Sequence, residues 1–126
     1  MSEYKSLRVA YGNDDPADID DGVVAIPAAA DRKFTVVDVW MRATGSMVTA
    51  TSVDVTDGTT IFASFEDTAL TNAALVRIGA ANTAATNLGT AAIANTAISV
   101  GTVGSDIGTT TALEWCVFYT VESVAG

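Results

Sequence analysis

The fold is indicated most clearly by the stretch VTATSVDVTDGTTIFASF, residues 48–65, in which two alternating segments flank Asp57-Gly58. Val53 and Val55 alternate with polar residues before this pair, and Ile61, Ala63 and Phe65 alternate after it. A period of two is typical of a strand with one buried face. An Asp-Gly pair supplies the positive backbone angles that a two-residue type I′ turn requires. The stretch therefore predicts a β-hairpin.

A second strand is predicted at FTVVDVWMRATG, residues 34–45, which is rich in β-branched and aromatic residues and ends at a glycine. Alternation places one set of side chains on a face expected in the core: Val37, Val39 and Met41. The other face then carries Phe34, Val36, Asp38, Trp40 and Arg42. Because Trp40 lies there between an acid and a base, this face is suited to contact a second subunit. The alternative is that a second sheet of the same chain covers it.

The longest final strand is predicted at ALEWCVFYTVES, residues 112–123. One of its faces carries Leu113, Trp115, Val117, Tyr119 and Val121, and we expect Trp115, Val117 and Tyr119 in the core. The opposite face carries Glu114, Cys116, Phe118, Thr120 and Glu122.

Further strand patterns occur at 4–12, at 23–26 before Pro27, at 74–79 and at 97–103, with a loop expected at 103–111. The alanines of 69–97 favour helix by propensity, but Gly79 and Gly89 interrupt any long helical stripe. About seven or eight short strands without alternating helices predict an all-β fold, a jelly-roll-like antiparallel β-sandwich. The length of 126 residues fits a single domain. We expect residues 1–22 to form an N-terminal strand or arm with an acidic loop, and residues 23–126 to form the sandwich.

Charge and composition exclude several partners. The net charge is −9, only 17% of residues are charged, and the mean hydropathy is +0.36. Nucleic acid and anionic membranes are bound by clustered Lys and Arg, so neither is expected as a partner. No apolar run resembles a secretory signal or approaches the ~18 residues of a membrane span. An apolar chain with so few charges is suited to be a subunit of a larger assembly.

Catalytic chemistry is not supported by the residue types present. The chain has no histidine and a single cysteine, Cys116, which excludes the usual Ser-His-Asp and Cys-His pairs and an intrachain disulfide. Glu66 and Asp67 are adjacent, so in a strand they would point to opposite faces. We therefore expect no enzymatic activity, no catalytic residues and no cofactor.

The segment GNDDPADIDDG, residues 12–22, carries five aspartates. It does not fit an EF-hand, because a start at Asp14 puts Pro16 at position three and Ile19 at position six. A solvated loop built from turn-forming residues is the main interpretation, and no metal site is assigned. A looser calcium site formed by Asp14, Asp18 and Asp20 remains an alternative.

A family resemblance is carried by DRKFTVVDVWMRATGSMVTATSVDVTDG, residues 31–58, and NTAISVGTVGSDIGTTTALEWCVFYTV, residues 95–121. These Thr-, Ala- and Gly-rich strands with acidic loops and few lysines resemble the jelly-roll decoration, or cement, proteins of tailed bacteriophages. The resemblance implies a non-enzymatic homotrimer on the outside of the virion capsid, made in the host cytoplasm. It would stabilise contacts between major capsid proteins. Its partners would therefore be other copies of itself and the major capsid protein.

Within that interpretation, the trimer contact is predicted to contain Asp38, Trp40, Arg42 and Phe118, and the segment through Tyr11 is a candidate arm onto the shell. Two alternatives remain open at this point. One is a phage head-fibre or tail receptor-binding β-sandwich that binds glycans, and the other is an ordinary carbohydrate-binding module.

Overall fold

The computed structural model describes residues 6–45, 50–92, 96–104 and 112–123, which form ten β-strands and one short helix. In chain order these elements are β1 Ser6–Asp14, α1 Pro16–Asp21, β2 Val23–Ile26, β3 Arg32–Thr44, β4 Ala50–Thr56, β5 Ile61–Glu66, β6 Leu75–Arg77, β7 Thr83–Ala84, β8 Ala91–Ala92, β9 Ile98–Gly104 and β10 Ala112–Ser123. Within this part of the chain, no helix is long and apolar enough to cross a membrane.

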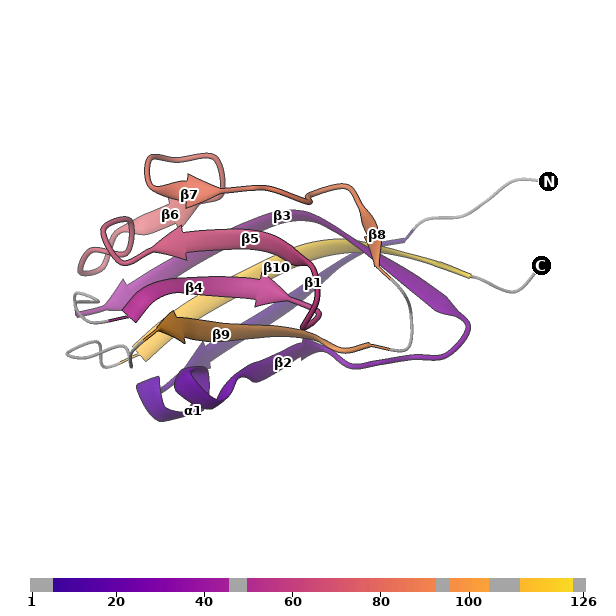
Figure 1. Ribbon diagram of the computed structural model, residues 1–126, viewed down its shortest axis with the longest axis horizontal. Coiled ribbons are helices and arrows are strands. Elements are labelled where there is room, and N and C mark those ends of the chain that lie inside the picture. The colour runs from indigo at the N-terminus through magenta and orange to yellow at the C-terminus, as the bar shows by residue number, and fades with distance from the viewer. Residues whose placement is uncertain (1–5, 46–49, 93–95, 105–111, 124–126) are drawn as a thin grey trace.

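The strands form two antiparallel sheets packed face to face (Figure 1). The first sheet has the order β1-β10-β3-β6, with β8 also paired to β3, and the second has the order β2-β9-β4-β5-β7. Consecutive strands lie in opposite sheets at every step except the β4–β5 hairpin. This interleaving is the jelly-roll arrangement, and the predicted fold class is confirmed.

The predicted hairpin is present, but its turn differs from the prediction. β4 pairs antiparallel with β5, and Thr56 is opposite Ile61, so four residues rather than two connect the strands. The carboxylate of Asp57 accepts hydrogen bonds from the backbone N–H groups of Thr59 and Thr60, and Gly58 has a φ of 95°. The side chain of Asp57 therefore organises a four-residue loop. The Asp-Gly pair by itself does not tell such a loop from a two-residue type I′ turn.

The N-terminal segment is part of the sandwich. β1 pairs with β10 from Ser6↔Val121 to Asp14↔Leu113, so Ser6–Asp14 is an integral edge strand and not a free arm. The acidic segment that follows contains a helix rather than only a loop: Asp15 caps α1, Pro16 starts it, and Ile19 is buried in the core. Both elements therefore pack against the rest of the sandwich.

The core lies between the sheets and contains Val39, Met41, Trp115 and Val117, all predicted there. Tyr119 is half-buried at the edge of the core, where its ring meets Phe34 edge-to-face at 5.9 Å.

The prediction for Val37 was wrong, since its side chain is 40% exposed. The register between β3 and β10 shifts here: Phe118 is opposite Asp38, whereas Tyr119 is opposite Val36. Val37 is the extra residue of this β-bulge, and a bulge reverses the alternation on its N-terminal side. Phe34 and Val36, predicted on the outer face, are therefore buried.

Candidate interaction face

One side of the first sheet points away from the second sheet. Its side chains alternate with the buried residues Val39, Met41, Trp115 and Val117, so they project outward. We call this surface the outer face and define it by Leu7, Val9 and Tyr11 of β1, Glu114, Cys116 and Phe118 of β10, Asp38, Trp40 and Arg42 of β3, and Leu75 and Arg77 of β6.

The outer face exposes large apolar side chains in a row along its edge strand. Leu7 is 66% exposed, Val9 is 53% exposed and Tyr11 is 57% exposed. Leu75, on the opposite edge of the sheet, is 65% exposed. Single exposed apolar residues are ordinary, but neighbouring ones on one face are typical of an interaction surface.

The structure brings the four predicted contact residues together on this face. Arg42 is opposite Glu114 in the β3–β10 register, Trp40 is opposite Cys116, and Asp38 is opposite Phe118. Trp40 is half-buried, because the ring of Tyr11 lies against it with 6.5 Å between centroids. The aromatic part of the face therefore extends onto β1.

Cys116 is opposite both Tyr11 and Trp40 and is buried beneath this aromatic pair. Burial raises the pKa of its thiol, so the sulfur remains protonated and acts as a small apolar group.

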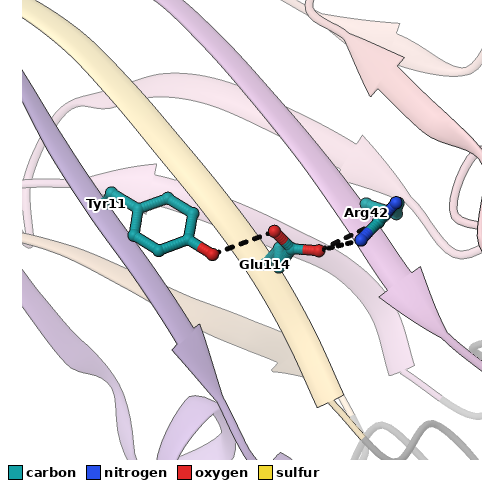
Figure 2. Close-up of polar contacts among 3 residues, drawn as sticks. All are labelled: Tyr11, Arg42 and Glu114. Carbon is teal, nitrogen blue, oxygen red and sulfur yellow. Dashed lines mark hydrogen bonds and ion pairs between the residues drawn. The ribbon is translucent and has the colours of Figure 1, made fainter.

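A polar cluster lies at one end of the outer face, across β1, β10 and β3 (Figure 2). The hydroxyl of Tyr11 donates to Glu114 Oε2 at 2.9 Å, and Arg42 Nε donates to Glu114 Oε1 at 2.9 Å. A second guanidinium nitrogen of Arg42 forms an ion pair with the same carboxylate. The hydrogen bonds from Tyr11 and then Arg42 lower the pKa of Glu114, while the carboxylate raises the pKa of Tyr11.

A second ion pair lies beside Trp40. Arg77 Nη2 is 2.7 Å from Asp38 Oδ2, and Arg77 Nε donates to the same oxygen at 2.9 Å. This hydrogen bond and the charge of Asp38 raise the pKa of Arg77. Both arginines of the outer face are thus neutralised by carboxylates of the same face. A partner surface that covers it would not have to supply matching charges.

Tyr11, Glu114, Arg77 and Leu75 were not predicted for the contact surface. Each belongs to a segment that the sequence correctly indicated as a strand, but strand order decides which segments become neighbours. Two alternations were usable signals: that of residues 4–12 puts Tyr11 with Leu7 and Val9, and that of residues 112–123 puts Glu114 with Phe118.

The pKa of Glu114 predicts how the polar cluster responds to pH. Because the folded state lowers this pKa below its ordinary value of 4.5, the cluster stabilises the fold above pH 4.5 and loses that contribution as pH falls through the folded value. Glu114→Gln should therefore unfold at a lower temperature than the unaltered protein at pH 7, and this difference should shrink at pH 3.

Thermal unfolding by circular dichroism at pH 7, 5 and 3 measures this difference. Glu66→Gln, at an exposed position on β5, is the matched control. A difference for Glu114→Gln that does not change with pH would contradict the assignment.

The carboxylates of the acidic segment have structural partners. Asp14 accepts a 2.8 Å hydrogen bond from Trp115 Nε1, Asp15 accepts from the backbone N–H of Asp18, and Asp20 accepts from the hydroxyl of Thr102. Repulsion from Asp15 is the largest cause that raises the pKa of Asp18. Across the described ranges, no group of three or more His, Cys, Asp or Glu side chains is arranged to hold a metal ion. Asp14, Asp18 and Asp20, the residues of the calcium alternative, form no such group.

Comparisons of this chain with protein-family models, with curated proteins and with solved structures find no match.

Proposed function

We propose that this protein is a non-enzymatic structural component of a tailed-phage virion, a trimeric decoration protein that binds the outside of the capsid. It stabilises contacts between major capsid proteins through binding free energy alone, since a protein that binds only the assembled shell shifts the equilibrium toward that shell. The jelly-roll fold agrees with the resemblance noted for residues 31–58 and 95–121.

The observation that supports this proposal most strongly is the outer face. It combines exposed apolar residues on β1 with the half-buried Trp40 and Phe118, and its cations are already paired. Interface centres are enriched in aromatic residues and in arginine. We assign this face to the contact between copies of the chain, because the same surface carries the predicted contact residues.

The strong negative charge is compatible with an exterior position. A net charge of −9 keeps exposed surfaces soluble and disfavours nucleic acid as a partner. The acidic helix α1 lies at the opposite end of the sandwich from the described start of β1 and the end of β10 (Figure 1).

Replacement of Trp40 with alanine tests the subunit contact. The expected result is a folded chain that dissociates at concentrations at which the unaltered protein is a trimer, because interface tryptophans contribute on the order of 2 kcal/mol or more to binding. Sedimentation velocity over a dilution series measures the oligomeric state. Val24→Ala, which removes an exposed apolar side chain from β2 in the other sheet, is the matched control and should remain trimeric.

Unchanged association of Trp40→Ala at high dilution would remove Trp40 from the contact, and a monomeric unaltered protein would overturn the trimer.

Capsid binding itself is tested with expanded, DNA-free shells assembled from the major capsid protein of the same phage. Purified protein should co-sediment with the shells at a saturating fixed ratio and should raise their melting temperature. Absence of co-sedimentation, together with binding to host-cell glycans, would replace this proposal with the receptor-binding alternative.

A further inference from the structure

An open pocket of about 480 Å³ lies at the end of the sandwich where the chain passes from β2 to β3. We call it the mouth pocket and define it by Arg8, Pro27, Arg32, Phe34, Tyr119 and Val121, with Ile26 and Ala28–Ala30 completing its wall. Its volume lies in the range typical of small-molecule sites, about 300–1,000 Å³.

The charge of the mouth pocket is unusual for this chain. Arg8 and Arg32 are the only charged residues in its lining, although the protein has a net charge of −9. Among the described residues neither arginine forms an ion pair, whereas Arg42 and Arg77 of the outer face are both paired with carboxylates. Two guanidinium groups that border one pocket and have no carboxylate partner among the described residues are suited to bind an anion from solution.

The remaining wall is apolar and aromatic. Phe34 is buried, Tyr119 is half-buried, and their rings meet edge-to-face at 5.9 Å. Pro27 and three alanines form the side contributed by the β2–β3 connection. This surface fits a ring or another flat apolar group rather than a bare inorganic ion.

An adjoining depression places two carboxylates beside the two arginines. It shares Arg8, Ala30, Arg32 and Val121 with the mouth pocket and adds Ser6, Asp31 and Glu122. These two carboxylates repel an anion in proportion to its charge, which offsets part of the extra attraction that a phosphate dianion would gain from the two arginines.

We propose that the mouth pocket binds a small ring-bearing carboxylate. Its carboxylate is held by Arg8 and Arg32, and its ring lies against Phe34, Tyr119 and Pro27. Sugar acids and aromatic acids share this chemistry. The proposal concerns the core side of the first sheet and does not depend on the capsid function, which uses the outer face.

The test is a titration of the full chain at low salt, monitored by ¹H–¹⁵N correlation spectra, with glucuronate, benzoate, glucose and inorganic phosphate as separate probes. Glucuronate or benzoate should shift the amide signals around Arg8, Arg32 and Tyr119, with glucose and phosphate at least about tenfold weaker. Stronger binding of glucuronate identifies a sugar acid as the ligand class, and stronger binding of benzoate identifies an aromatic acid.

Substitutions of the two arginines test whether they hold the carboxylate of the ligand. Arg8→Gln and Arg32→Gln should each weaken binding of the preferred probe about tenfold or more, because each removes a charge-assisted hydrogen bond. Arg77→Gln, which alters a paired arginine on the outer face, is the matched control and should bind like the unaltered protein. The proposal is overturned if neither acid binds at tens of millimolar, if glucose or phosphate binds as tightly, or if both pocket variants bind normally.

Discussion

Trp115→Ala is expected to lower the free energy of unfolding by about 3–5 kcal/mol, the range for removal of a large aromatic side chain from a core. Trp115 is only 3% exposed and lies on β10, in the middle of the first sheet. Its indole N–H also donates to Asp14 Oδ2, which joins β10 to the end of the edge strand β1. The substitution therefore leaves a cavity and removes a contact between two strands.

Urea denaturation followed by far-ultraviolet circular dichroism measures this loss without relying on tryptophan fluorescence. Trp115→Phe is the matched comparison, since it keeps an aromatic ring in the core and removes the N–H donor. It should cost less than Trp115→Ala. A loss below about 1 kcal/mol for Trp115→Ala would mean that the indole is not packed as the structure shows.

Gly12→Ala is expected to lower the free energy of unfolding by about 1–3 kcal/mol, because it overpacks the same region. A Cβ atom at Gly12 would lie 2.4 Å from two carbon atoms of the Trp115 indole and 2.6 Å from its nitrogen. The indole is enclosed by the core and hydrogen-bonded to Asp14, so it has no free direction in which to move. The substitution should therefore strain the backbone of β1.

Gly101→Ala is the matched control for this prediction. It also lies in a strand, β9, but an added Cβ there would be 3.4 Å from the Cα of Gly22 and 3.6 Å from the carbonyl oxygen of Ile19. Such contacts are close to ordinary van der Waals separation, and alanine restricts the unfolded chain more than glycine does. Urea titrations of both variants should show a clear loss for Gly12→Ala and little change for Gly101→Ala. Equal losses would contradict a specific clash with Trp115.

Much of the secondary structure was predictable because it follows from local patterns. The last strand occupies the predicted residues 112–123, β2 ends before Pro27 at a sheet edge, and the β4–β5 hairpin is present. Alternation, β-branched residues and turn-forming residues all act over a few positions, so they are readable without knowing the partner strands. The predicted loop at 103–111 lies mostly outside the described residues.

The bulge at Val37 shows where local reading fails. At this bulge the register of β3 shifts against β10, a strand about 80 residues away in the chain. The one extra residue reverses the face on which every earlier position of β3 lies. Phe34 and Val36 are core residues for this reason, although strict alternation from Val39 puts them outside.

The candidate sites also depend partly on local sequence patterns and partly on strand pairing. The sequence by itself determined an all-β chain with apolar strand faces, a negative charge and no histidine chemistry, because composition and short-range alternation suffice for those conclusions. Only the tertiary structure decided that Tyr11, Arg42 and Glu114 form one cluster, and that Arg8 and Arg32 border one pocket. The physical reason is that the jelly roll inserts β10 between β1 and β3. Residues from both ends of the chain become neighbours through strand pairing, which no local pattern encodes.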